Sequence, residues 1–271
     1  MSIKIGADPE LFVKFGKDFI SVEDNRGPLI PGTKAQPYEV KGGAIQVDGV
    51  AAEFNVNPST TFKAFYGNTK SVLKDLQARM KKHNKKLSLA PVPTAFFKQD
   101  YFDQLPEHVK VLGCDPDFDA YQDGAPNPRP QTDKPFRTGS GHFHIGWYSP
   151  ASHVDPFYQG HIEDCCLVAK QLDKYFLEAA KDWDKDKTRM ELYGKPGTFR
   201  PKPYGMEYRA PSNAWLSSYE SLRAAYYITL GVVRGMDSVE LNLNDDTKGY
   251  GDTHSERVIS KLAKYIPEVY N

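Results

Sequence analysis

The chain has 271 residues, 39% of them hydrophobic and 26% charged, and 35 basic residues balance 35 acidic ones. Zero formal net charge argues against tight non-specific binding to nucleic acid, although a local basic patch stays open. Apolar runs are too short to cross a bilayer and Met1 leads directly into a strand pattern, so we expect neither a membrane span nor a signal peptide. Three cysteines without framework spacing indicate a reducing compartment, and Cys165 and Cys166 are expected in the core.

The N-terminal region is expected to contain a strand with two acidic residues. Residues 2–15 follow a strand pattern that Gly and Pro interrupt, which predicts a bulge or a sharp bend. Asp8 and Glu10 are two positions apart and can share one face, although an acidic turn that caps a hairpin is the alternative. Residues 24–43 are rich in Gly and Pro and are expected to form an ordered loop or flap.

The clearest strand pair covers residues 44–56, with a hairpin-type Asp-Gly turn at residues 48–49. Alternation along the second strand places Glu53 and Asn55 on its polar face. A carboxylate on such a face is usually solvated, and it gains a function only if the face lines a cleft.

Helical spacing of apolar residues predicts amphipathic helices over residues 59–82 and about 160–183, and two more that start near Ser217 and Thr253. Ser217 and Thr253 each precede a glutamate by three positions, the pattern of a capping box. Residues 93–138 are rich in Pro and show no period, so we expect a long irregular lid or substrate loop.

A Gly-rich turn followed by a short strand carries two histidines. Alternation places His142 and His144 on one face, and Phe143 and Ile145 on the other. Imidazole is the side chain most often used to hold a metal ion. The alternative is an exposed strand with two solvated histidines.

A later strand, residues 206–209, carries Glu207 and Arg209 on one face. It follows a Gly- and Pro-containing loop with further cationic residues, among them Arg189 and Arg200. Arginine beside a carboxylate would neutralise it, unless the carboxylate binds metal and the arginine binds an anion such as phosphate.

Together these strands predict an α+β architecture, in which helices cover the apolar face of a mainly antiparallel sheet. The polar faces would then form a concave trough on the opposite side. Carboxylates with one or two histidines make an oxygen and nitrogen site, which suits Mg²⁺ or Mn²⁺ better than structural zinc.

Three motifs resemble those of glutamine synthetases and occur in the same order. Residues 6–10 resemble their first metal-binding strand, residues 139–144 their Gly-x-Gly-x-His-x-His strand, and residues 207–211 their Glu-x-Arg-x-Pro strand. The compact length and residues 193–209 are more similar still to the phage-type COOH–NH2 ligases, or amidoligases, of that superfamily. One departure is Asp8, which stands where the family has the longer Glu.

The resemblance implies one glutamine-synthetase-like domain over residues 1–271, with a curved sheet whose concave polar face is the active site. It also implies an ATP-dependent carboxylate–amine ligase. A substrate carboxylate would attack the γ-phosphate of ATP to form an acyl phosphate, and an amine would then displace phosphate to form an amide or isopeptide bond. A flap would exclude water from this intermediate.

The resemblance also implies roles for individual residues. Two or three Mg²⁺ or Mn²⁺ ions would be held by Glu10, Glu53, His142 and Glu207, with Asp8 as a further candidate ligand. His144 and Asn55 would lie beside the nucleotide. Arg209, together with Arg200 or Arg189, would stabilise the charge of the transferring phosphoryl group.

Two other functions are compatible with the same residues. A metal-dependent hydrolase would use the ligands with a bound water, but would leave Arg209 without a role. A non-catalytic binding protein could keep the fold. As a ligase, the protein would take a small-molecule or peptide acid and an amine, with nucleic acid involved only as a modified base. Its expected location is the cytoplasm, or the host cytoplasm if a phage encodes it.

Overall fold

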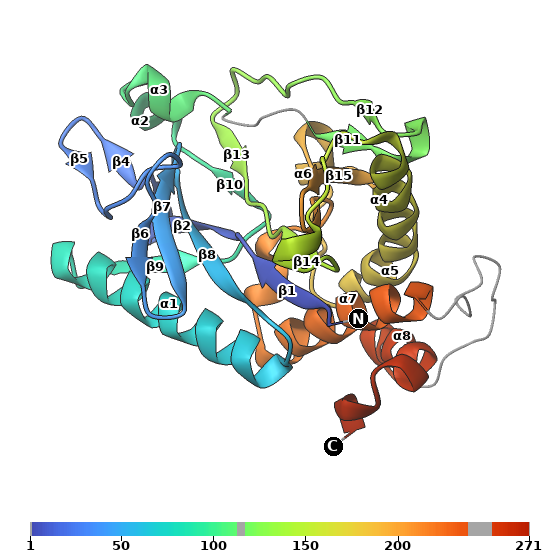
Figure 1. Ribbon diagram of the computed structural model, residues 1–271. Helices are drawn as coiled ribbons and strands as arrows, with labels where there is room; N and C mark the ends of the chain where they lie inside the picture. The colour runs from blue at the N-terminus through green and yellow to red at the C-terminus, as the bar shows by residue number, and fades with distance from the viewer. Residues whose placement is uncertain (1, 113–116, 238–250, 271) are drawn as a thin grey trace.

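The computed structural model describes residues 2–112, 117–237 and 251–270 (Figure 1). Within these ranges twelve strands form one sheet, and all of their pairings are antiparallel. The strands are β1 (Lys4–Ala7), β2 (Glu10–Phe15), β3 (Asp18–Ile20), β6 (Tyr38–Val40), β7 (Gly43–Asp48), β8 (Ala51–Ser59), β9 (Leu87–Ala90), β11 (Phe118–Asp119), β12 (Ala125–Pro126), β14 (Phe143–Gly146), β15 (Thr198–Lys202) and β16 (Gly205–Tyr208). The main order is β12-β11-β15-β16-β14-β1-β8-β2-β3; β7 joins β8 to β6, and β9 pairs with β2.

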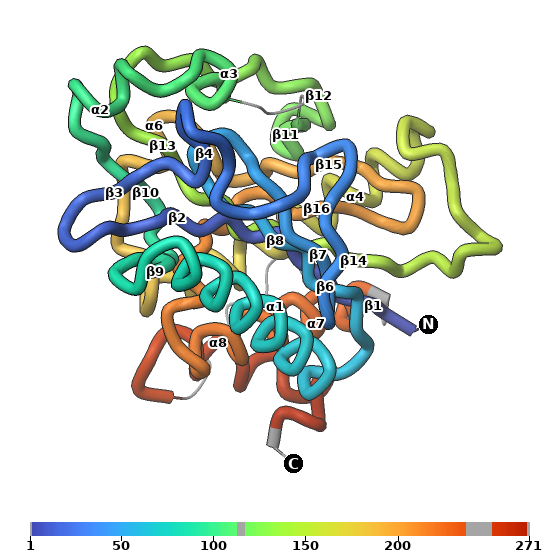
Figure 2. Tube along the Cα trace, turned by 90° about the vertical axis from the view of Figure 1, so that its left-hand side faces the viewer, coloured from blue at the N-terminus to red at the C-terminus, as the bar shows by residue number. Residues whose placement is uncertain are grey.

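The long helices cover one face of this sheet. The helices are α1 (Phe62–His83), α2 (Gln99–Asp103), α3 (Glu107–Lys110), α4 (Gln159–Leu172), α5 (Glu178–Ala180), α6 (Arg189–Leu192), α7 (Tyr219–Asp237) and α8 (His254–Leu262). Helix α1 packs on β7, β8 and β9, and α4 packs on β15 and β16. Figures 1 and 2 place α1, α7 and α8 on one side of the sheet and α2 and α3 on the other. The expected α+β architecture with a mainly antiparallel sheet is therefore confirmed. None of the helices in the described ranges has the length and apolarity needed to span a membrane.

The core is built around Phe143 of β14. Its ring centroid lies 4.9 Å from that of Trp215, 5.6 Å from Phe176 and 6.2 Å from Phe65. All four side chains are fully or almost fully buried, and each contributes about 1.5–3 kcal/mol of transfer free energy. The strand that carries both histidines is thus anchored in the largest apolar cluster. Cys165 and Cys166 are buried in the same cluster, as predicted, whereas Cys114 lies outside the described residues.

Helix boundaries follow the local capping groups. Helix α1 begins at Phe62 and not at residue 59, because Ser59 ends β8 and the Thr61 hydroxyl accepts from Ala64 N. The capping box at Thr253 is confirmed. The one expected at Ser217 is wrong, because Ser218 and Ser221 exchange hydrogen bonds at the start of α7.

The two segments that we expected to be loops, one ordered and one irregular, contain paired strands. Residues 24–43 include part of the β4–β5 hairpin (Glu23–Asp24 and Gly27–Pro28) and all of β6. Within residues 93–138, β10 (Thr94–Phe96) pairs with β13 (Phe136–Thr138), and α2 and α3 lie between them. Short strands that pair across some forty residues leave no period in the sequence, which is why the expectation of a long irregular loop was wrong.

A buried carboxylate lies behind β16. Asp173 belongs to a π-helical turn, Asp173–Leu177, that joins α4 to α5, and it accepts a hydrogen bond of 2.7 Å from Tyr208 Oη. Burial raises the pKa of Asp173 to about 6. The folded protein therefore keeps a proton on this group at pH values where the unfolded chain has released it.

We expect Asp173→Asn to gain stability relative to the wild type as pH rises from 4 to 7. The wild type loses stability between the ordinary pKa of 3.8 and the folded value of about 6, because over that interval the folded state binds more protons. The relative gain should be about 2–3 kcal/mol in urea unfolding. The exposed Asp164 of α4 provides a matched control, as Asp164→Asn. A pH-independent difference for Asp173→Asn would contradict the prediction.

Candidate active site

Polar side chains of four strands meet on the face of the sheet opposite the core. Strand register aligns Arg200, Glu207, His144 and Gly6 across β15, β16, β14 and β1. The adjacent row contains Phe199, Tyr208, Phe143 and Ala7, all of them buried in the core. Because side chains alternate along a strand, the first row faces the other way. This face carries Arg200, Glu207 and His144; the sequence predicts the polar positions of Glu207 and His144, whereas β15 is an addition to the predicted strands.

The Gly-rich turn before β14 packs closely against the segment that follows β16. A Cβ on Gly141 would lie 2.2 Å from Ser212 O and 2.4 Å from Trp215 Nε1. With glycine there, Trp215 Nε1 donates to Gly141 O at 3.0 Å, and Asn213 Nδ2 donates to Glu10 O at 2.7 Å. The segment after β16 therefore holds both the turn before β14 and the start of β2.

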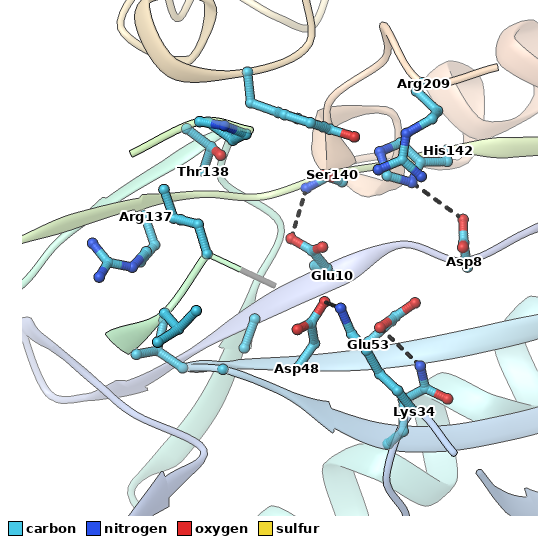
Figure 3. Close-up of a pocket in the computed structure, with 18 of the residues that line it drawn as sticks. Asp8, Glu10, Lys34, Asp48, Glu53, Arg137, Thr138, Ser140, His142 and Arg209 are labelled. Atoms are coloured by element: carbon cyan, nitrogen blue, oxygen red, sulfur yellow. Dashed lines mark hydrogen bonds and ion pairs between the residues drawn. The ribbon is translucent and has the colours of Figure 1, made fainter. Parts of the chain in front are cut away.

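Asp8, His142 and Glu207 form a compact group, here called the ligand triad. Each offers one ligand atom, and these atoms lie within 4.8 Å of one another. His142 Nδ1 is 3.5 Å from Asp8 Oδ1 and 3.3 Å from Glu207 Oε1, and Figure 3 shows the first of these contacts. No hydrogen bond within the described ranges reaches the buried His142 Nε2. Two carboxylates and an imidazole fit one Mg²⁺ or Mn²⁺ ion.

Neighbouring cations keep both carboxylates of the triad charged. Burial alone would raise the pKa of Glu207, but the Arg209 guanidinium and the His142 and His144 imidazoles outweigh it and hold that pKa well below its ordinary value. Burial is likewise outweighed at Asp8, where the His144 charge lowers the pKa. Both groups can therefore bind a cation at neutral pH without first losing a proton.

Glu10 and Glu53 form a second group, here called the carboxylate pair, and lie opposite each other on β2 and β8. Ser140 N donates to Glu10 Oε2 at 3.1 Å, and Gln46 Nε2 donates to Glu53 Oε2 at 2.9 Å. Asn55 Nδ2 donates to Gln46 Oε1 at 3.3 Å. Asn55 thus lines the cavity and also orients Gln46 toward Glu53.

The carboxylate pair holds protons more tightly than ordinary glutamates. Burial and the charge of Asp48 raise the pKa of Glu10 to about 7. Burial, together with the charges of Asp8, Asp48 and Glu10, raises the pKa of Glu53 well above its ordinary value. A cation bound beside the two would favour their charged forms.

Arg200, Lys202 and Arg209 border the triad on the β15–β16 side and are called the cationic group. Arg200 Nη1 and Lys202 Nζ lie 3.2 Å and 3.1 Å from Glu207 Oε2. Arg209 contacts Glu207 Oε1, and its Nε lies 3.6 Å from Asp117 Oδ2. All three cations line the same cavity. Such a group can bind a phosphate chain by charge-assisted hydrogen bonds.

His144 connects the triad to a tyrosine. Its Nε2 lies 3.0 Å from Asp8 Oδ2, and its Nδ1 lies 2.5 Å from Tyr204 Oη. Burial disfavours the charged imidazole, but the Asp8 charge outweighs burial and raises the pKa of His144. His144 is therefore held beside the triad between Asp8 and Tyr204.

Arg189 takes a structural position and not the expected one beside a nucleotide. It is 3% exposed, and its guanidinium donates to the backbone oxygens of Gly139, Ala210 and Pro211 at 3.2, 2.7 and 2.9 Å. These bonds tie the turn before β14 to the segment after β16. The expectation that Arg189 binds the cofactor is corrected accordingly, because its donors are committed to the backbone.

Most of the predicted site residues line one cavity of about 450 Å³ (Figure 3). The candidates that line it are Asp8, Glu10, Glu53, Asn55, His142, His144, Arg200 and Arg209. Its lining also includes Lys34, Gln46, Asp48, Tyr193 and Lys202, which the sequence reasoning did not single out. Two of these residues could have been predicted from the sequence. Lys202 is two positions after Arg200 and shares its strand face, and the hairpin register places Gln46 opposite Glu53.

His142→Ala is expected to lower the affinity for Mn²⁺ at least about tenfold, because the triad loses its only nitrogen ligand. Isothermal titration with Mn²⁺, without nucleotide, measures this loss. His108 on α3 has a side chain that is 68% exposed, so His108→Ala serves as the matched control. Equal Mn²⁺ affinity in His142→Ala and the wild type would remove His142 from the metal site.

The comparisons with known proteins add no family to these observations. The sequence matches no protein-family model and no curated protein.

Proposed function

We propose that this protein is an ATP-dependent carboxylate–amine ligase that forms an amide or isopeptide bond through an acyl phosphate. The observation that carries the proposal is one cavity lined by Asp8 and His142 of the ligand triad, by the carboxylate pair and by the cationic group, with Glu207 of the triad buried beside them. A metal-dependent hydrolase of an uncharged bond would use the ligands but would leave the three cations beside them without a role. A glutamine-synthetase-like curvature of the sheet, with a concave polar face, belongs to the same proposal.

The proposed reaction has two displacement steps. First, a carboxylate oxygen of the acid attacks the γ-phosphorus of ATP, the bond from that phosphorus to the β–γ bridging oxygen breaks, and ADP leaves. Second, the amine nitrogen attacks the acyl carbon, the bond from that carbon to the phosphate oxygen breaks, and phosphate leaves as the amine gives up a proton. The ligand triad and the carboxylate pair would hold divalent ions, which when bound would neutralise phosphate charge.

The side chains of this chain would serve these steps by charge and position. The acid and the triphosphate repel each other, so both need positive charge nearby. The cationic group would bind the phosphate chain, and Arg209 would meet the charge that develops on the transferring phosphoryl group. His144, held between Tyr204 and Asp8, would lie beside the phosphates. The carboxylate pair and the triad would bind the divalent ions.

The proposal is tested by phosphate release from ATP in the presence of Mg²⁺ and a matrix of acids and amines. We expect release only when both an acid and an amine are present, and a product whose mass equals acid plus amine minus water. The acids should include amino acids, peptides and cell-wall fragments, and modified nucleobases should be tried as amines. Phosphate release with water alone, or cleavage of a substrate without ATP, would favour a hydrolase. Failure to bind Mn²⁺ and ATP would favour a non-catalytic protein.

A further inference from the structure

The cavity has an apolar end at the turn between β7 and β8. Its lining there comprises Phe12, Pro37, Val50, Val109, Val111 and Leu112. The chain after α3 passes directly over this turn, since a Cβ on Gly49 would lie 3.0 Å from Val109 O and 3.7 Å from Val111 O. Val111 is 63% exposed although it is apolar. This end therefore offers accessible apolar surface inside a cavity whose other walls are charged.

One ion pair stands at this apolar end. Asp48, the last residue of β7, has its Oδ2 2.8 Å from Lys34 Nζ, as Figure 3 shows. Lys34 is at the tip of a turn in which Thr33 and Gln36 exchange two backbone hydrogen bonds of 3.1 Å. The side chains of Lys34 and Asp48 are 48% and 18% exposed. The side-chain ammonium of Lys34 thus already binds the Asp48 carboxylate at this end of the cavity.

The charges of the cavity are also ordered across the sheet. In the order β15-β16-β14-β1-β8-β7, the cationic group comes first, the ligand triad follows, then the carboxylate pair, and Asp48 is at the far side. A phosphate chain is favoured at the first end and a cation at the last. Anions are disfavoured at Asp48, because it is a carboxylate and its neighbours Glu10 and Glu53 are also carboxyl groups.

We propose that Asp48 binds the ammonium group of the amine substrate, which is a primary alkylamine whose chain lies against the apolar end. This inference rests on the proposed ligase function. The incoming ammonium takes the place that Lys34 holds, so Lys34 is a competitor within the chain. The apolar wall explains why an alkylamine fits better than ammonia, since each buried methylene improves affinity by about fourfold. The amine also approaches the acid from the side away from the cationic group, which would repel it.

The test is direct binding of n-butylammonium, titrated by calorimetry without ATP, acid or metal. Asp48→Asn should weaken binding by about tenfold, because a charge-assisted hydrogen bond is lost. Lys34→Ala should strengthen binding by about threefold, because a partly exposed competitor is removed. Lys98→Ala is the matched control: it removes a lysine 2.7 Å from Asp18 outside the cavity, and should change nothing. Ammonium chloride should bind more weakly than n-butylammonium to the wild type.

Two results would overturn the inference. One is butylammonium binding that Asp48→Asn leaves unchanged. The other is weaker binding in Lys34→Ala, which would mean that the ion pair only holds the Lys34 turn in place. Asp48→Glu keeps the charge and should retain most of the affinity, which separates loss of the subsite from loss of the fold.

The binding test and the ligation test can fail separately. If no acid and amine pair is ligated but butylammonium binding depends on Asp48, the ligase proposal falls and the ammonium subsite stands. If ligation occurs, Asp48→Asn should raise KM for the amine about tenfold and leave KM for ATP within about twofold. Ligation with an amine KM that is indifferent to Asp48 would overturn the subsite and leave the ligase proposal intact.

Discussion

Arg209→Lys is expected to bind Mn²⁺ and ATP almost as tightly as the wild type but to have a kcat at least about a hundredfold lower. The Arg209 guanidinium is 4% exposed, contacts Glu207 and lies 3.6 Å from Asp117 Oδ2. Lysine keeps the charge but cannot reproduce the planar fork that meets several oxygens at fixed angles. Single-turnover phosphate release and nucleotide titration on the same variant measure both quantities.

A structural role for Arg209 predicts a different pattern. If the guanidinium only orients Glu207, Arg209→Lys should weaken metal and nucleotide binding together and leave kcat unchanged at saturation. Arg26, whose side chain is 87% exposed and bound to Asp24, supplies the control Arg26→Lys, which should alter neither quantity. The two outcomes are separable because kcat and affinity are measured independently.

Glu207→Gln is expected to lower the free energy of unfolding by about 3–5 kcal/mol at neutral pH, the cost of breaking a buried ion pair from one side. Glu207 is 1% exposed and accepts contacts from Arg200, Lys202 and Arg209. The amide is of similar size but carries no charge, so three cations would remain near one another without their carboxylate. Urea unfolding of the wild type and variant measures the difference.

The pH dependence of this loss gives a second check. The Arg209 charge and the imidazoles outweigh burial and keep the pKa of Glu207 below the ordinary 4.5. The carboxylate therefore contributes stability that is present above that value and lost as pH falls toward the folded pKa. The difference between Glu207→Gln and the wild type should shrink on acidification. Glu163→Gln on the exposed face of α4 is the control, and an equal effect of both variants would contradict the prediction.

Alternation and turn chemistry made much of the polar face predictable. The hairpin of β7 and β8 was predicted, although its turn is at Gly49 and Val50, one residue later than expected, because Asp48 pairs with Ala51. The buried Phe143 and Ile145 place His142 on the opposite face. Helical periods located the long helices to within a few residues. The expectation that these strands belong to one sheet is confirmed by the strand order, although different helices cover its two parts: α1 packs on β7, β8 and β9, and α4 packs on β15 and β16.

The remaining parts depend on pairings that the sequence does not display. Arg189 donates its hydrogen bonds to backbone oxygens. Because every residue type has a backbone oxygen, the residues at the acceptor positions do not indicate these bonds. Lys34 reaches Asp48 from a loop turn, so neither strand nor helix periodicity places it in the cavity. The β10–β13 pair similarly joins two short segments that each lack a period of their own.

The central place of β1 has a consequence for how the protein is made on the ribosome. Lys4 pairs with Gly146 on one side of β1, while on the other side Ile5 pairs with Ser59. Strand β1 emerges first, yet it can be flanked on both sides only after β14 has been synthesised, and β16 comes later still. Such long-range pairing slows folding and leaves strand edges exposed for a time. Low growth temperature or a co-expressed chaperone should therefore raise the yield of folded protein more than changes at the C-terminal helices would.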